Sequence, residues 1–279
     1  MLSINYLGQL GRIGNQMFQY ATLISLAKKH GYDYCLPRND IPEWLGCEIA
    51  LYDCFNLSNL DKKIKDRTDY PYYYPSCSRY DSEYVNNCPS HVDLVSYYQS
   101  DKYFSEYEDL IRKEYTFKEH ILKQSQDIFY RMFYDSNVIS LHVRRSDIID
   151  DEYLNSLDIS YYEKALQCFD PYLPVLIFSD DIEWCKQLSI FQHPRFKISG
   201  NEVMIDLCMM SLCNYHIIAN STLSWWGSWL AESKKTIAPR KWYKKSNIKI
   251  PRGNNYILYT NENAVWDATD IYRDDWILV

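Results

Sequence analysis

The sequence lacks any run of about eighteen consecutive apolar residues, which is what a helix needs to cross a bilayer. None of its nine cysteines forms a CxxC pair, and its six histidines are not spaced with them as metal ligands. A disulfide framework and a zinc site are therefore not predicted. The net charge of −7 argues against general affinity for nucleic acid. What remains is a globular chain of 279 residues, 47% hydrophobic, enough for one large or two modest domains.

Strands and helices alternate in the second half of the chain. Apolar runs predict strands, and helical spacing of apolar residues predicts the segments between them. The expected strands cover 138–144, 174–179, 216–219 and 236–238, and the expected helices cover 161–169, a segment after Asp181, 204–214 and 223–232. This alternation is typical of an α/β fold with a doubly wound parallel sheet. The first 36 residues predict one strand-helix-strand unit, and 101–134 is expected to be helical.

A polar turn joins the strand ending near Ile218 to the helix that follows it. Asn220, Ser221 and Thr222 form this turn. Hydroxyl side chains at such a position cap the free N–H groups of a helix, and those N–H groups and the helix dipole attract an anion. The turn is therefore either an ordinary helix cap or part of an anion site.

Polar residues also interrupt the strand expected over 138–144. Alternation places His142 and Arg144 on one face at its carboxyl end, where open α/β sheets bind ligands. Arg144 and Arg145, with Asp147 nearby, suit a diphosphate, because guanidinium groups bind phosphate oxygens and a carboxylate can hold one of them in place. An ion pair between Arg145 and Asp147 would explain those two residues, but not the polar residues on a buried strand face.

The N-terminus predicts a strand, a glycine-rich turn and a helix. The strand is expected over Ile4–Leu7, the turn over Gly8–Gln16, and the helix from about Met17 to Lys29, closed by Gly31. Backbone amides in such a turn can approach a phosphate closely. No Lys-Ser/Thr pair follows, so the turn is not a phosphate loop, and a nucleotide-dependent kinase or hydrolase is disfavoured.

Several blocks of the sequence resemble glycosyltransferase family eleven, the α-1,2-fucosyltransferases. The blocks are Gly11–Ala21, His142–Asp147, Phe178–Cys185 and Asn220–Leu230, and the ending Asp274–Ile277 is similar as well. The resemblance implies an α/β, GT-B-like architecture with two Rossmann-like domains facing a cleft. It also implies GDP-L-fucose as donor and a galactoside hydroxyl as acceptor. Animal members carry an N-terminal anchor, so the pattern here predicts a bacterial, cytoplasmic enzyme, with peripheral attachment to the inner membrane left open.

We expect three parts in the chain. Residues 1–134 form an N-terminal acceptor-side domain, and residues 135–250 form a C-terminal GDP-fucose-binding domain. The segment 251–279 is expected to pack back on the body.

Site roles follow from the motifs and the resemblance together. Arg144 is expected to be catalytic, because it can neutralise the charge that grows on the β-phosphate as the bond to fucose breaks. The acceptor-side residues are expected to be Arg12, Asn15 and Gln16. The expected donor-binding residues are His142, Arg145, Asp147, Asp180, Asp181, Asn220, Ser221, Thr222, Gly14 and Asn15.

Two features allow more than one interpretation. Asp180 and Asp181 could hold Mg²⁺ against a diphosphate, could accept hydrogen bonds from guanine or ribose, or could cap the next helix; the resemblance favours nucleoside contact for at least one. Tyr72–Tyr74 could line an acceptor groove or could pack like most of the tyrosines.

The expected reaction is inverting transfer of L-fucose from GDP-β-L-fucose to the 2-hydroxyl of a terminal galactoside, which forms an α-1,2 linkage. No metal and no cofactor are expected, since GDP-fucose is a co-substrate. The acceptor is expected to be a galactose-terminated glycan, with or without a lipid carrier. The sequence does not identify the general base. Two alternatives are a fucosyltransferase acting on another acceptor hydroxyl and a non-catalytic sugar-binding protein.

Overall fold

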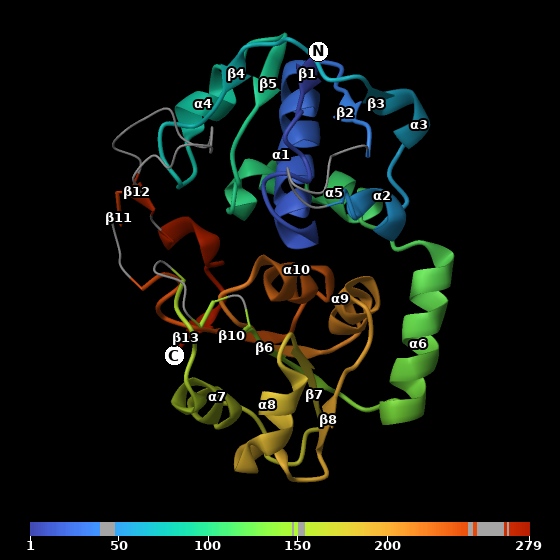
Figure 1. The fold of residues 1–279 in the computed structure, drawn as a ribbon, viewed down its shortest axis with the longest axis vertical. Helices are drawn as coiled ribbons and strands as arrows, with labels where there is room; N and C mark the ends of the chain where they lie inside the picture. Colours follow the sequence, from blue (N-terminus) through green and yellow to red (C-terminus); the bar gives the residue numbers. More distant parts are fainter. Residues whose placement is uncertain (40–47, 147, 150–153, 245–247, 250–264, 267) are drawn as a thin grey trace. The chain divides into compact units, whose positions relative to one another are not determined.

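The structure is a computed structural model of the chain (Figure 1). It describes residues 1–39, 48–146, 148–149, 154–244, 248–249, 265–266 and 268–279. The chain divides into two compact units, the first made of Met1–Thr116 with Ser246–Arg273, and the second of Phe117–Lys245 with Asp274–Val279. Within the described residues, no helix is both long enough and apolar enough to cross a membrane.

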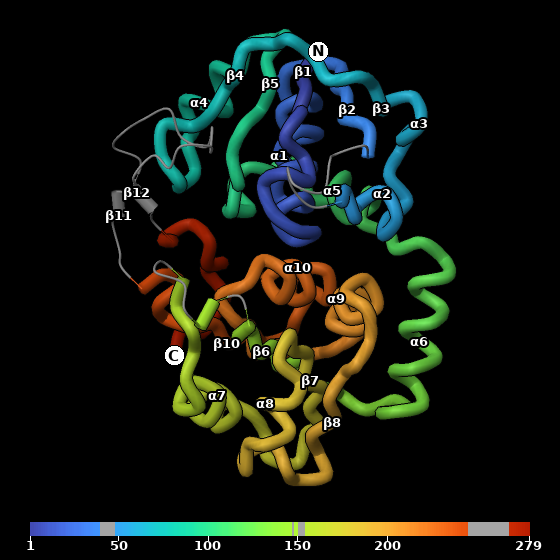
Figure 2. Tube along the Cα trace, in the orientation of Figure 1, coloured from blue at the N-terminus to red at the C-terminus, as the bar shows by residue number. Residues whose placement is uncertain are grey.

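The first unit is built around one long helix, α1 (Ile13–His30). A short parallel sheet in the order β1-β5-β4 accompanies it, made of β1 (Leu2–Ser3), β5 (Val92–Leu94) and β4 (Tyr72–Tyr73). Figure 2 traces the chain through this unit. Its remaining elements are β2 (Leu36–Pro37), α2 (Leu51–Cys54), α3 (Leu60–Lys63), β3 (Ile64–Lys65), α4 (Ser82–Asn86), η2 (Asp101–Tyr103), η3 (Ser105–Tyr107), α5 (Glu108–Glu114), β11 (Ile248–Lys249), β12 (Val265–Trp266) and η5 (Thr269–Ile271).

The strand predicted over Ile4–Leu7 is wrong. The strand is Leu2–Ser3, and residues 5–9 form turns. The Asp93 carboxylate accepts the backbone N–H of Asn5 at 2.8 Å, so this polar contact replaces a sheet hydrogen bond. Helix α1 also begins four residues before the predicted Met17. Its end at Gly31 is confirmed, because Gly31 adopts the left-handed conformation at φ 66° that glycine favours after a helix.

The second unit contains a six-stranded, fully parallel sheet. Its strands lie in the order β13-β10-β9-β6-β7-β8. The strands are β6 (Ile139–Val143), β7 (Val175–Ser179), β8 (Phe196–Ile198), β9 (Tyr215–Ile217), β10 (Lys235–Ala238) and β13 (Ile277–Leu278). The helices are α6 (Glu119–Phe133), α7 (Ile159–Leu166), α8 (Ile182–Gln187), α9 (Val203–Ser211) and α10 (Thr222–Leu230), with a 3₁₀ turn η4 (Ser189–Phe191).

Helices cover both faces of this sheet (Figure 1). On one face, alternate residues of β6 such as Leu141 form a core with Tyr162 of α7 and Cys185 of α8. On the other face, the hydroxyl of Thr236 on β10 contacts the hydroxyl of Ser228 on α10 at 2.6 Å, and Nε2 of His216 on β9 lies 2.9 Å from the backbone oxygen of Met210 on α9. The predicted doubly wound parallel sheet is therefore confirmed. The short strands β8 and β13 were not predicted.

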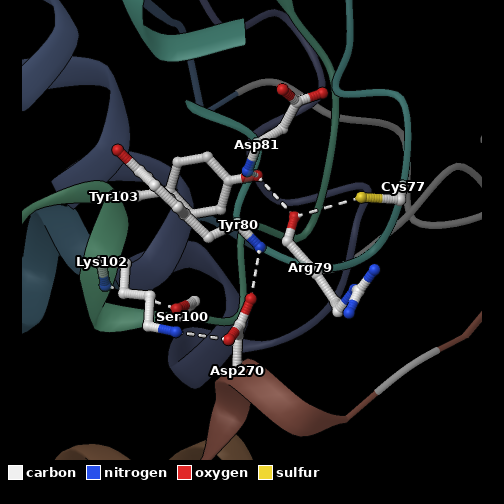
Figure 3. A network of polar contacts seen from close by, with 8 residues as sticks. All are labelled: Cys77, Arg79, Tyr80, Asp81, Ser100, Lys102, Tyr103 and Asp270. Carbon is white, nitrogen blue, oxygen red and sulfur yellow. Dashed lines mark hydrogen bonds and ion pairs between the residues drawn. The ribbon is translucent and has the colours of Figure 1, made fainter. Parts of the chain in front are cut away.

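The boundary between the units lies one helix earlier than the predicted position of 134/135. Helix α6 belongs to the second unit, where the Ser125 hydroxyl donates to the backbone oxygen of Ile205 on α9 at 3.5 Å. The described residues of the C-terminal segment divide between the units. Asp270 accepts hydrogen bonds from the Lys102 ammonium and from the backbone N–H of Tyr80 in the first unit (Figure 3). In the second unit, β13 pairs with β10.

Candidate donor site at the switch point of the second unit

The order of the strands in the second unit reverses between β6 and β9. From β6, the chain adds β7 and β8 on one side, and then β9, β10 and β13 on the other. A doubly wound sheet binds its ligand outside the carboxyl ends of the strands at such a reversal. His142, Arg144 and Arg145 lie at or after the end of β6, and the turn 220–222 follows β9. The structure thus brings the two most informative sequence motifs to the same edge of one sheet.

His142 joins the two sides of this switch point. Its side chain is buried, and its Nδ1 lies 2.9 Å from the Ser224 hydroxyl on α10. The Ser224 hydroxyl donates its single proton to the backbone oxygen of Ser221 at 3.2 Å. Ser224 thus contacts both the His142 ring and the backbone of the turn at Ser221. The ring therefore ties the end of β6 to the start of α10.

Ser221 occupies the N-cap position of α10 but does not cap it with its side chain. Its backbone is extended, at φ −142° and ψ 128°, and no hydrogen bond joins its hydroxyl to the first turn. The ordinary explanation of this residue, a helix cap, is therefore wrong. Ser221 lies at the positive end of the helix without the stabilising role that serine usually has there.

The amide of Asn220 makes contacts within the protein. Its amide nitrogen donates to the backbone oxygens of Asn155 and Trp242, the latter at 3.0 Å. Both amide protons are thereby used within the protein, while its Oδ1 is buried without a partner among the described residues. Asn220 therefore connects the segments that contain Asn155 and Trp242, and its predicted contact with the donor stays a prediction.

Arg145 is held against the start of α8. Its Nε lies 3.3 Å from Asp181 Oδ2, and its guanidinium carbon lies 3.9 Å from the centre of the Trp184 ring. The predicted partner Asp147 lies outside the described residues. Arg144, the preceding residue, is half-buried and lies just past the last residue of β6. Arg145 therefore supports the start of α8.

The two aspartates after β7 are engaged by the protein. Strand β7 ends at Ser179, so it does not continue through Asp180 and Asp181. Asp181 caps α8 by accepting the N–H of Trp184 at 3.1 Å, which confirms one of the three interpretations for this residue. Asp180 accepts the backbone N–H of Arg145 at 2.8 Å. Within the described residues, no group of three or more His, Cys, Asp or Glu side chains is placed to hold a metal ion.

The predicted residues of the first unit surround the start of α1. Arg12 is the exposed N-cap, Gly14 lies in the first turn, and Asn15 is half-buried beside it. Gln16 is fully buried, and its amide nitrogen donates to the backbone oxygens of Gly11 at 3.2 Å and Glu48 at 2.8 Å. Gln16 therefore braces the turn before the helix, and its predicted contact with an acceptor stays a prediction.

The tyrosine triplet divides between packing and exposure. Tyr73 stacks on Tyr84 with ring centres 4.4 Å apart, and its hydroxyl donates to the backbone oxygen of the same residue. Tyr72 and Tyr74 are exposed. Only these two could face a sugar.

The sequence analysis missed one ionisable residue of the second unit. Asp206 lies in the first part of α9, the helix that follows β8, and accepts the hydroxyl proton of Ser199. Burial is the main reason that its pKa is raised, from an ordinary value of 3.8 to about 7. The signal that could have found it is a carboxylate within an otherwise apolar helix that starts beyond the carboxyl end of a strand.

Known proteins resemble this chain in sequence and fold. Residues 3–260 match the sequence profile of glycosyl transferase family 11. The O-antigen biosynthesis glycosyltransferase WbnK of Escherichia coli is 32% identical over 85% of this chain and 94% of its own length. The α-1,2-colitosyltransferase of Escherichia coli is 30% identical over 85% and 92%. The fucosyltransferase NodZ from Bradyrhizobium matches in fold, with a TM-score of 0.52 at 14% identity over 82% and 92%.

The comparisons agree with the fold and with the sequence motifs described above. The structural likeness and the parallel sheets confirm the α/β, GT-B-like fold. The sequence matches confirm the resemblance carried by the motifs at the switch point and around α1. The chain belongs to glycosyl transferase family 11 and is a glycosyltransferase.

Proposed function

We propose that this protein transfers L-fucose from GDP-β-L-fucose to the 2-hydroxyl of a terminal galactoside and inverts the anomeric centre to give an α-1,2 linkage. The observation that carries the proposal is the position of Arg144, His142 and Ser221 at the switch point of a doubly wound sheet. The name of the colitosyltransferase relative supports the α-1,2 linkage.

The pyrophosphate of the donor is proposed to lie at the start of α10. The N–H groups there carry the positive end of the helix dipole, and the Ser221 hydroxyl is not used for capping. Arg144 supplies the full positive charge from the end of β6. As the bond to fucose breaks, negative charge grows on the β-phosphate, and preorganised groups at such a position commonly contribute about 3 kcal/mol or more each.

His142 is proposed to keep this arrangement rigid. The path from its Nδ1 through Ser224 to the Ser221 backbone oxygen fixes the turn relative to the strand. A group positioned in advance does not have to reorganise during the reaction, and this lowers the barrier. Arg145 supports the same edge through Asp181 and Trp184.

The reaction is proposed to need no divalent metal. Asp181 caps α8 and pairs with Arg145, and Asp180 accepts the Arg145 N–H. Their charge is thus met by the protein. Arg144 and the start of α10 supply positive potential for the two phosphates.

The acceptor is proposed to be a galactose-terminated glycan of the kind found in bacterial O-antigens, because WbnK is named for O-antigen biosynthesis. The first unit is proposed to bind the acceptor and the second to bind the donor. A second candidate donor sugar is colitose, favoured by the name of the second relative.

The test is incubation of the protein with GDP-fucose or GDP-colitose and a panel of galactosides, followed by mapping of the product linkage by NMR. We expect release of GDP and a new α-1,2 linkage to galactose. A linkage to another hydroxyl would overturn the regiochemistry. Binding of the glycans without release of GDP would show a sugar-binding protein instead.

A further inference from the structure

A hydrogen bond joins two amide side chains that are 84 residues apart in the first unit. Gln99 Nε2 donates to Asn15 Oδ1 at 2.9 Å. The side chain of asparagine has one accepting oxygen and one donating nitrogen. Since Gln99 takes the oxygen, the nitrogen of Asn15 is the end directed away from Gln99. The bond therefore fixes the orientation of the Asn15 amide.

The turn before α1 is shaped around the Asn15 amide. A Cβ atom on residue 11 would lie 2.1 Å from Asn15 Nδ2, far inside van der Waals contact. Gly11 also has φ +100°, a conformation that residues with side chains rarely adopt. The positive φ favours glycine at residue 11, and the close approach shows that the Asn15 nitrogen lies against this turn.

The residue before Gln99, Tyr98, has a strained backbone conformation. Tyr98 has φ +51°, which is uncommon for a residue other than glycine. Its buried ring lies 5.3 Å from the ring of Tyr103, and its hydroxyl is 2.7 Å from the Tyr84 hydroxyl. The backbone oxygen of Tyr98 accepts the N–H of Ser100 at 2.7 Å. Figure 3 shows Ser100 and Tyr103 in the network that holds this segment. Such strain persists where the surroundings fix it, and it clusters at functional sites.

The position of Asn15 makes a donating nitrogen chemically useful. Asn15 lies in the first turn of α1, and that turn contains no acidic residue. The N-cap residue Arg12 makes no side-chain capping bond. The start of α1 carries the positive end of the helix dipole, and an amide nitrogen adds to that potential, whereas an amide oxygen would oppose it. An accepting oxygen of a phosphate or a sugar suits this arrangement.

We propose that Gln99 is a positioning residue that holds the Asn15 amide with its nitrogen toward the substrate. The inference rests on the proposed function, because it takes Asn15 as a residue that contacts donor or acceptor. Without the Gln99 N–H, the amide can rotate by half a turn and present its oxygen to the accepting atom of the substrate. A hydrogen bond then becomes a repulsion.

The experiment compares Gln99→Glu with Gln126→Glu by steady-state kinetics with GDP-fucose and a galactoside. A carboxylate at position 99 can only accept, so it binds the Asn15 nitrogen and reverses the amide. We expect kcat/KM to fall about a hundredfold, the loss typical of one preorganised donor. Gln126 is exposed on α6, so its variant adds the same charge elsewhere and is expected to keep the wild-type rate. Thermal unfolding of each variant shows whether it is folded.

A double-mutant cycle separates positioning from direct contact. Asn15→Ala alone is expected to lower kcat/KM about a hundredfold, and Gln99→Glu added to it is expected to lower the rate no further. Additive losses, or a Gln99→Glu enzyme with the wild-type rate beside an impaired Asn15→Ala, would overturn the inference and leave the proposed function intact. An unimpaired Asn15→Ala would refute the assignment of Asn15 itself. A wild-type protein that releases no GDP with any acceptor would refute the proposed function.

Discussion

The carboxyl group of Asp206 is expected to make the stability of the second unit depend on pH. Burial raises the pKa of this group from 3.8 to about 7, so the folded state favours the neutral acid. The unfolded chain ionises near pH 4, whereas the folded protein resists ionisation until about pH 7. The contribution of Asp206 to stability is therefore fully present below pH 4 and is lost as the pH rises toward 7.

The size of this effect follows from the shift. A difference of about 3 pH units corresponds to about 4 kcal/mol at 1.36 kcal/mol per unit. This is an upper value, because water and small movements relieve part of the cost of a buried charge. Asp206→Asn removes the ionisation and keeps an oxygen that accepts the Ser199 hydroxyl proton. The variant is therefore expected to match the wild type near pH 4 and to exceed it by as much as about 4 kcal/mol at pH 8.

The assay is urea unfolding of wild type, Asp206→Asn and Asp127→Asn at several pH values from 4 to 8. Asp127 is exposed on α6, so its variant controls for the loss of one carboxylate. The reasoning is refuted if Asp206→Asn is no more stable than the wild type at pH 8. A residue that costs stability is often kept for activity, so we also expect the variant to raise the KM for GDP-fucose by about tenfold.

Three further predictions concern the switch point. Arg144→Ala should lower kcat about a hundredfold, because it removes the charge opposite the leaving phosphate, while Arg145→Ala should be milder because that side chain supports α8; equal effects in a kinetic assay would contradict this. Ser221→Ala should weaken GDP binding in calorimetric titration with little change in melting temperature, since the hydroxyl does not cap α10; the reverse outcome would show a structural role. Turnover should survive excess EDTA, and Asp180→Asn or Asp181→Asn should raise the KM for GDP-fucose without creating a need for Mg²⁺; loss of activity that Mg²⁺ restores would identify metal ligands.

The sequence predicted the second unit well because its signals are local. The alternation of apolar runs and helical spacing placed β6, β7, β9 and β10 within two residues of their observed limits. The motifs at 142–145 and 220–222 fell at strand ends, where a parallel sheet gathers them. The order in which the strands pair, with β9 beside β6, brings these two motifs together.

The sequence was less informative where the hydrogen-bond partners of a residue lie far away along the chain. The amide of Asn220 donates to the backbone oxygens of Asn155 and Trp242, and the amide of Gln16 donates to that of Glu48. These contacts could not be deduced from neighbours in sequence. The expected strand Ile4–Leu7 had an acceptable apolar pattern, but the Asp93 carboxylate draws the chain into a turn. The same limitation hid the bond between Gln99 and Asn15.

The pairing of β13 with β10 has a consequence for biosynthesis. Ile237 lies beside Ile277 in this parallel pair, so the partner of β10 is made 40 residues later. Until then, one edge of the nascent sheet presents unpaired N–H and C=O groups, a template for association with other chains. A chain that stalls or is cleaved before β13 would therefore keep its donor motifs and yet be prone to aggregate, so C-terminal integrity is expected to govern the yield of usable protein.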